Sequence, residues 1–213
     1  VFLVHGWDGR KNNHWFPWLI AELKARYFVV DALSMPTPAT PHVKEWIATI
    51  KDAVGTPDEH TYFVGYSLGC VTIVRYLESL PKKSKVGGAI FVAGFSGNIS
   101  SPELAEFYGD ERGARGRERS DTVSESKSPK GVSPYATPEQ PIDFARVKSI
   151  CPKIMTLFSD DDPVVPLVKG ISFAKSIGAK VIIEKGKGHF CKDDGVTALP
   201  TVLETLVDMS EEK

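Results

Sequence analysis

Six short apolar runs, separated by helical patterns, constrain the fold of this chain more than any other feature of its sequence. The runs are residues 1–4, 27–32, 61–64, 89–93, 153–158 and 180–184. Their residues are continuously apolar rather than alternately apolar and polar, which is typical of strands buried on both faces. Such strands, when they alternate with helices, form a mostly parallel sheet with right-handed crossovers. The sequence therefore predicts an α/β fold with a mostly parallel central sheet of about six strands and helices on both faces.

Five segments between and after these runs have the apolar spacing of helices. They are residues 15–26, 41–54, the stretch between Ser67 and Pro81, residues 166–178 and residues 201–209. In the second segment the apolar positions recur at helical spacing from Val43 to Val54. We expect Thr40 to cap this helix and Pro41 to be its first residue, because proline is well suited to that position.

The length of the chain, 213 residues, suits one domain with a sizeable core. We therefore expect a single domain over residues 1–213. The alternation of strands and helices is interrupted between residues 96 and 140, and residues 109–134 are almost without apolar side chains. A loop of that length in a compact domain is either functional or disordered. We expect residues 109–134 to form a mobile excursion.

Charge and composition exclude several classes of partner. The net charge is -1, and the arginine-rich stretch 110–121 contains as many acidic as basic residues, so neither predicts a nucleic-acid partner. No apolar run approaches the length of a membrane span. The histidines lack the spacing of zinc ligands, and three cysteines without a C-x-x-C pair fit a reduced setting. We expect a cytoplasmic monomer without a metal, nucleic acid or membrane.

A serine between two glycines follows the third apolar run. Gly65-Tyr66-Ser67-Leu68-Gly69 has the pattern G-x-S-x-G, in which the serine occupies a sharp turn from strand to helix. The glycines allow that strand and helix to approach closely, and the first N–H groups of the helix face any developing negative charge. The pattern can arise by chance, but an apolar run before it and a helical pattern after it favour Ser67 as a nucleophile.

A serine hydroxyl needs a base, and the base needs an orienting group. His189 follows the sixth apolar run, and three consecutive aspartates at 160–162 follow the fifth. The chain order Ser, Asp, His is that of α/β-hydrolases, and the carboxyl ends of parallel strands meet at one edge of the sheet. We choose Asp162, directly before the turn into the next helix, with Asp161 as the alternative. Asp160 is expected to cap or solvate the loop.

The loop after the first run, residues 5–9, is expected to complete an oxyanion hole. Donors aimed at the developing charge are often the largest catalytic contribution. We assign one donor to the backbone N–H of Leu68 and the second to that of Trp7, with Gly6 as the alternative. His5 is expected to hold this loop rather than to act as a second base.

The chain resembles the small serine hydrolases related to retinoblastoma-binding protein 9, within the α/β-hydrolase superfamily. The matching stretches are VHGWDG, NHWFPWL, LSMPTP, GYSLG, CPKIMTLFSDDDPVVP and GKGHF, and they extend from the first residues to Phe190. The resemblance implies an α/β-hydrolase fold without a large cap domain, and a catalytic triad of Ser67, Asp162 and His189. The excursion over 109–134 is longer than is usual for the family. The L-x-C-x-E pattern of retinoblastoma binding is absent.

The leading hypothesis is a serine hydrolase that cleaves a small ester, thioester or amide through an acyl-enzyme, without a cofactor. One alternative keeps the triad but transfers the acyl group to an acceptor other than water. Another is a non-catalytic or weakly catalytic binding module on the same fold, with the 109–134 loop meeting a protein partner. The presence of all three triad residues favours the first hypothesis.

Overall fold

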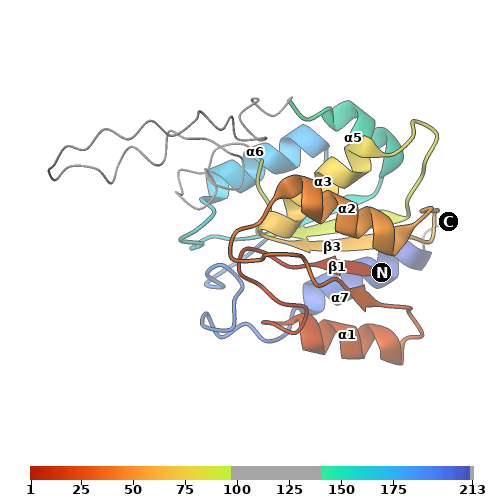
Figure 1. Cartoon of the computed structure of the whole chain (residues 1–213). Helices are drawn as coiled ribbons and strands as arrows, with labels where there is room; N and C mark the ends of the chain where they lie inside the picture. The colour runs from red at the N-terminus through yellow and green to blue at the C-terminus, as the bar shows by residue number, and fades with distance from the viewer. Residues whose placement is uncertain (97–140, 212–213) are drawn as a thin grey trace, which may run out of the picture.

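The computed structural model describes residues 1–96 and 141–211, and its strands form one sheet in the order β2-β1-β3-β4-β5-β6 (Figure 1). The strands are β1 (Phe2–Val4), β2 (Asp31–Ala32), β3 (Tyr62–Tyr66), β4 (Gly88–Val92), β5 (Ile154–Ser159) and β6 (Lys180–Glu184). All neighbouring strands in it pair in parallel. The predicted parallel sheet of about six strands is confirmed.

The second strand is much shorter than its apolar sequence suggested. Only Asp31 and Ala32 pair with β1, while Tyr27 and Val29 are 96% and 87% exposed. Tyr27 has a φ of 65°, and its N–H donates to the carbonyl of Lys24 at the end of the preceding helix. A residue with a left-handed backbone ends a helix and cannot extend a strand. The prediction of a strand over 27–32 was therefore wrong for its first four residues.

The described helices are α1 (Phe16–Ala25), α2 (Val43–Val54), α3 (Leu68–Ser79), α5 (Phe144–Ile150), α6 (Leu167–Ile177) and α7 (Pro200–Glu211). Four of them lie within the predicted segments, and α7 extends beyond both ends of the predicted segment 201–209. The sequence analysis did not predict α5, because a helix of seven residues is too short to show a clear period. None of these described helices has the length and apolar character needed to cross a membrane.

The predicted start of α2 was wrong. The residue that caps the helix is His42, whose backbone is extended and whose carbonyl accepts from the N–H of Trp46 at 3.0 Å. Thr40 instead closes a turn, with its N–H donating to the carbonyl of Thr37. Pro41 is buried. The chain is still entering the core at that residue, and the helix begins where its apolar face can pack.

Helices cover both faces of the sheet, as predicted (Figure 1). On one face α1 and α7 pack over a core that includes Trp15, Phe16 and Leu203. On the other face α2, α3, α5 and α6 cover a second core, which includes Trp46 and Phe173. Burial on both faces explains why β3, β4 and β5 are continuously apolar. The edge strand β6 is apolar without such burial, since Val181 and Ile183 are 37% and 47% exposed.

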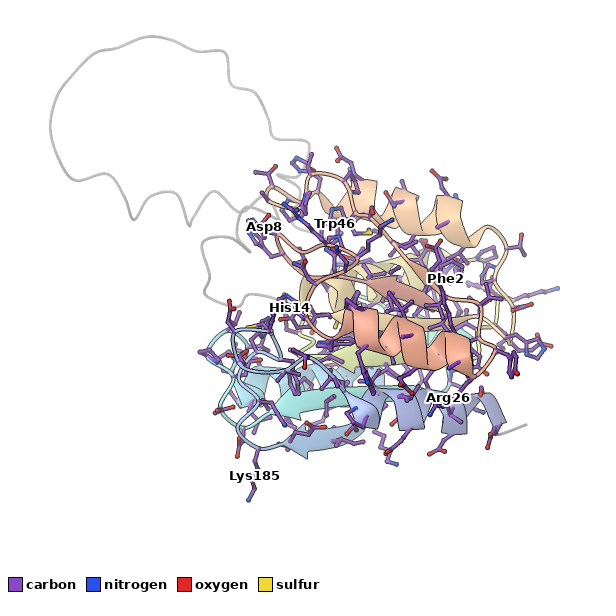
Figure 2. All side chains as sticks on the ribbon, turned by 90° about the horizontal axis from the view of Figure 1, so that it is seen from below. Phe2, Asp8, His14, Arg26, Trp46 and Lys185 are labelled. Atoms are coloured by element: carbon purple, nitrogen blue, oxygen red, sulfur yellow. The ribbon has the colours of Figure 1, made fainter. Side chains whose placement is uncertain are left out.

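Parallel pairing puts the carboxyl ends of all six strands at one end of the molecule. Figure 2 shows Asp8 and His14, which follow β1, at the same end as Lys185, which follows β6. Arg26, at the end of α1, lies at the opposite end. The excursion expected over 109–134, and the protein partner suggested for it, lie outside the described residues.

Candidate active site

Ser67 occupies a sharp turn between β3 and α3. Its backbone has φ 51° and ψ -117°, a conformation that residues other than glycine rarely adopt. The N–H of Ser67 donates to the carbonyl of Val92 at 2.9 Å, which ties the turn to the end of β4. A Cβ atom on Gly69 would lie 2.2 Å from the carbonyl oxygen of Val4, so α3 crosses directly over β1. This close approach is the predicted reason for a glycine in the pattern.

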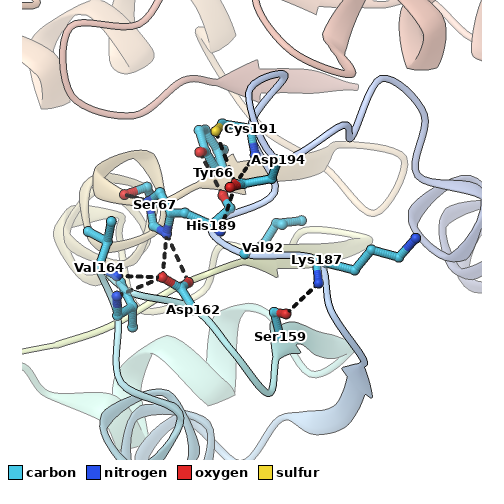
Figure 3. Close-up of polar contacts among 12 residues, drawn as sticks. Tyr66, Ser67, Val92, Ser159, Asp162, Val164, Lys187, His189, Cys191 and Asp194 are labelled. Atoms are coloured by element: carbon cyan, nitrogen blue, oxygen red, sulfur yellow. Dashed lines mark hydrogen bonds and ion pairs between the residues drawn. The ribbon is translucent and has the colours of Figure 1, made fainter.

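The loops after β3, β5 and β6 bring three side chains together (Figure 3). His189 Nε2 lies 3.0 Å from Ser67 Oγ. On the other side of the ring, His189 Nδ1 lies 2.8 Å from Asp162 Oδ2 and 3.1 Å from Asp162 Oδ1. The side chains of Asp162 and His189 are only 2% and 14% exposed. The structure thus brings together the three residues that the sequence singled out.

The surroundings of Asp162 determine which nitrogen of His189 carries the proton. Asp162 Oδ1 accepts hydrogen bonds from the backbone N–H groups of Val164 at 2.8 Å and Val165 at 2.9 Å. The carboxylate therefore acts as an acceptor, so His189 Nδ1 must be the protonated nitrogen. His189 Nε2 is left with a lone pair facing the hydroxyl of Ser67. In this tautomer the ring can accept the serine proton.

Asp161, the alternative orienting residue, is directed elsewhere. Its Oδ1 accepts from Ser159 Oγ at 2.6 Å and from the N–H of Gly188 at 2.9 Å. The hydrogen bond from the Ser159 hydroxyl, followed by that from Gly188, lowers the pKa of the Asp161 carboxyl. Asp161 therefore contacts the backbone of the histidine loop, whereas Asp162 contacts the ring.

The loop after β1 lies against Ser67. A Cβ atom on Gly6 would be 3.0 Å from Ser67 Cβ, and Trp7 follows directly. His5 Nδ1 donates to the carbonyl of Gly6 at 2.8 Å, and His5 Nε2 accepts from the N–H of Met35 at 3.3 Å. Burial lowers the pKa of His5, which favours this neutral form. Both ring nitrogens are engaged with backbone atoms, so His5 holds the loop.

The other assigned donor, the backbone N–H of Leu68, directly follows Ser67 in the chain. Leu68 is the first residue of α3, and the first N–H groups of a helix have no partner within it. Leu68 thus begins the helix that follows Ser67, and Trp7 follows Gly6, which approaches Ser67 closely.

Residues that the sequence analysis did not single out hold the loop of His189. Tyr66 Oη donates to the carbonyl of His189 at 2.8 Å, and the two rings are 5.3 Å apart. Burial raises the pKa of Tyr66, so the hydroxyl remains a donor. The ring of His14 packs edge-on against Tyr66, and His14 Nδ1 accepts from the N–H of Lys192 at 3.0 Å. Tyr66 occupies a variable position of G-x-S-x-G, and no spacing marks His14, so the sequence offered no signal for either.

The cysteines near the site do not provide a second nucleophile. Burial, and then a hydrogen bond to Asp194, raises the pKa of the Cys191 thiol, which donates to Asp194 Oδ2 at 3.0 Å. Burial also raises the pKa of Cys70 well above its usual range. A protonated thiol is not nucleophilic. Within residues 1–96 and 141–211, no three His, Cys, Asp or Glu side chains are grouped to hold a metal ion.

Comparison with known proteins gives a consistent set of matches. Residues 1–208 match the family described as serine hydrolase. YdeN of Bacillus subtilis (strain 168) is 30% identical over 206 residues, which cover 97% of this chain and 93% of YdeN. The serine hydrolase RBBP9 of Rattus norvegicus is 26% identical over 189 residues, which cover 88% of this chain and 79% of RBBP9.

Two solved structures show a similar fold. The crystal structure of the ydeN gene product from Bacillus subtilis matches with a TM-score of 0.80 and 29% identity, over 98% of this chain and 96% of that chain. The carboxylesterase CesB (YbfK) from Bacillus subtilis matches with a TM-score of 0.58 and 18% identity, over 100% of this chain and 83% of its own.

Proposed function

The chain belongs to the serine hydrolase family, and on this premise we propose that it cleaves a small ester, thioester or amide through an acyl-enzyme intermediate. The resemblance to small hydrolases related to RBBP9, the α/β-hydrolase fold and the assignment as an enzyme are confirmed, and the described residues form no large cap. The observation that supports the mechanism best is the continuous line of hydrogen bonds from Ser67 Oγ through the His189 ring to the Asp162 carboxylate.

In the proposed reaction Ser67 Oγ attacks the carbonyl carbon of the substrate while His189 Nε2 takes the hydroxyl proton. The His189 ring, which lies between Ser67 and Asp162, becomes positively charged. The Asp162 carboxylate stabilises this cation, and the two backbone N–H groups that bind Asp162 keep the carboxylate in place. His189 then donates its proton to the leaving alcohol, thiol or amine, which departs and leaves the acyl group on Ser67.

The negative oxygen that forms during the attack needs donors. We assign the backbone N–H groups of Leu68 and Trp7 to this role, with Gly6 as the alternative to Trp7. Two observations support the assignment: α3 begins at Leu68 with its N–H groups unpaired within the helix, and Gly6 approaches Ser67 closely. In the second half of the reaction His189 would take a proton from water, and the water oxygen would attack the acyl carbon. The proton then passes to Ser67 Oγ as the acid is released.

The substrate class is proposed to be a small molecule with an acyl group. Among the similar structures, CesB is described as a carboxylesterase, so carboxylic esters are the first substrates to test. We further propose that the protein is a monomer with a single domain over residues 1–213. A reduced, cytoplasmic setting is supported by the three cysteines, all of which are free.

Labelling with a fluorophosphonate tests the proposed nucleophile, because this probe reacts with serines activated by a base. We expect the wild type and the control Ser34→Ala, which changes an exposed serine, to label equally. Ser67→Ala should not label, and His189→Ala should react at least about 100-fold more slowly because the base is lost. The same variants should rank identically in the hydrolysis of a short-chain aryl ester.

Two results would contradict the proposal. If Ser67→Ala kept full esterase activity, the mechanism would be wrong. If folded wild-type protein neither labelled nor hydrolysed any ester, the binding-module hypothesis would be favoured instead. Product analysis with an added alcohol or amine separates hydrolysis from acyl transfer, since a transferase would form the new ester or amide in preference to the free acid.

A further inference from the structure

Four consecutive residues at 159–162 hold four consecutive residues at 186–189. Figure 3 shows two of these contacts, those of Ser159 with Lys187 and of Asp162 with His189. Asp160 Oδ1 accepts from the N–H of Gly186, Ser159 Oγ from that of Lys187 and Asp161 Oδ1 from that of Gly188, each at 2.9 Å, while Asp162 holds the ring of His189. The last residue of β5 and the loop after it thus supply an acceptor for each successive N–H group that leads to the histidine. Only the last contact belongs to the proposed triad.

Without these acceptors, the backbone of residues 186–189 could adopt other conformations, because it contains two glycines. Gly186 and Gly188 have φ values of 64° and 51°, so both adopt the left-handed region that glycine enters without strain. Two glycines within four residues give the chain many alternative conformations. The direction of the His189 ring depends on the backbone that carries it, so the ring is only as well placed as this loop.

Asp194 holds the same backbone from the other side. Its Oδ2 accepts from the N–H groups of His189 at 2.8 Å and Cys191 at 3.1 Å. A Cβ atom on Gly188 would lie 2.4 Å from Asp194 Cγ, so the absence of a side chain at 188 is what admits this carboxylate. Burial alone would raise the pKa of Asp194, but the hydrogen bonds from Cys191 and His189 lower it, which keeps the carboxylate ionised.

We propose that Asp161 is a positioning residue for the reaction, because its Oδ1 fixes the backbone of the histidine loop and so the place of the His189 ring. Asp161 Oδ1 is shared by two donors, the N–H of Gly188 and the hydroxyl of Ser159. Ser159 Oγ in turn accepts from Lys187, so the loss of one oxygen atom loosens two successive amides. The proposal rests on the proposed function, since it concerns the base of that reaction.

The kinetic test compares Asp161→Ala with Asp161→Asn. Asparagine keeps an oxygen acceptor and removes the charge, whereas alanine removes both. We expect Asp161→Ala to lower kcat for a short aryl ester by about 10-fold or more with KM changed by less than about 2-fold, because small displacements of a catalytic group are costly. Asp161→Asn should retain most of the kcat. Asp193→Asn, which removes a charge from an exposed residue of the same loop, is the matched control and should behave as wild type.

A second measurement does not depend on activity. The N–H of His189 is bonded to Asp194 and not to Asp161, so its hydrogen exchange reports whether the loop as a whole has loosened. By NMR, we expect this amide to exchange at least about 10-fold faster in Asp161→Ala and at the wild-type rate in Asp161→Asn and Asp193→Asn.

The proposal is overturned if Asp161→Ala keeps the wild-type kcat, if Asp161→Asn falls as far as Asp161→Ala, or if the His189 amide exchanges at an unchanged rate. If Asp161→Ala does not fold, Ser159→Ala takes its place, because it removes the acceptor of Lys187 and should lower kcat in the same way. A wild-type kcat in Ser159→Ala would then overturn the proposal. If folded wild type hydrolysed no ester, the proposed function would fail, and the exchange rates alone would decide whether Asp161 positions the ring.

Discussion

At the scale of single residues, three adjacent aspartates accept hydrogen bonds from three different residues. Asp160 and Asp161 accept from the backbone of the histidine loop, and Asp162 accepts from the histidine ring. The difference arises from direction, since the loop turns after residue 160 and each carboxylate points to a different part of the neighbouring loop. The residue type alone could not distinguish them, and the choice of Asp162 over Asp161 in the sequence analysis depended on its place before the next helix.

Asp162→Asn tests how much the orientation and charge stabilisation of His189 contribute, because the variant keeps the histidine and removes only the carboxylate. A carboxamide cannot stabilise the imidazolium as a carboxylate does, and its NH2 group would favour the wrong tautomer of His189. We expect kcat to fall roughly 10³- to 10⁴-fold with little change in KM or in the thermal unfolding midpoint. Steady-state kinetics on a short aryl ester, with Asp193→Asn as the control, measures this. A loss of less than about 10-fold would mean that Asp162 is not the orienting residue.

At the scale of elements, the contact between α3 and β1 places the nucleophile. The sequence predicted both elements from their apolar patterns, and it predicted a close approach from the glycines of G-x-S-x-G. It did not predict that β2 would contain only two residues, or that α5 would form. Both have weak signals in the local sequence. The turn that ends α1 includes the first residue of the expected strand, and α5 is too short to show a helical period of apolar residues.

The close approach can be tested by comparing two glycines. In Gly69→Ala the new methyl group would lie 2.2 Å from the carbonyl oxygen of Val4, and backbone cannot move aside easily. In Gly55→Ala no atom lies within 4 Å of the new Cβ, and only the φ of 64° is unfavourable. We expect the free energy of unfolding to decrease by about 3 kcal/mol or more for Gly69→Ala and by about 1 kcal/mol for Gly55→Ala.

Urea denaturation followed by circular dichroism measures both values. Equal losses in the two variants would show that α3 can move away from β1 at little cost. The turn at Ser67 would then be less rigid than its contacts with β1 and β4 indicate.

At the scale of the whole molecule, parallel pairing gathers the loops after β1, β3, β5 and β6 at one end. The site is built from these four loops, and Ser67 and His189, which meet in it, are 122 positions apart in the chain. One consequence is that a histidine from the first loop, His5, becomes buried among backbone groups that need it neutral. The stability of the molecule therefore depends on pH.

Burial lowers the pKa of His5 in the folded protein below its unfolded value of about 6.5. The folded state resists protonation of this ring, so its contribution to stability is complete above about pH 6.5 and is lost progressively as the pH falls from there to the lower folded pKa. We expect the free energy of unfolding to decline in that range by at most about 1.4 kcal/mol per pH unit from this group. The pKa of His14 is also lowered, mainly by burial, and adds in the same direction.

Urea denaturation at several pH values, from about 7.5 to about 5, measures this slope. His5→Gln should reduce the slope, and His60→Gln, which changes an exposed histidine, should leave it as in wild type. An unchanged slope in His5→Gln would show that His5 is not responsible for the loss of stability in acid.

The sequence by itself determined the alternation of the strands with five of the described helices, the parallel sheet and the three side chains that meet at its edge. These follow from apolar periodicity and from short motifs, which are local properties that a single chain displays directly. Only the tertiary structure decided the rest: that Asp161 and Asp194 hold the backbone of the histidine loop, that His14 and Tyr66 pack beside it, and where α2 begins. Each of these depends on contacts between residues far apart in the chain or on the burial of one residue, and no local pattern records which groups will face one another once the loops meet.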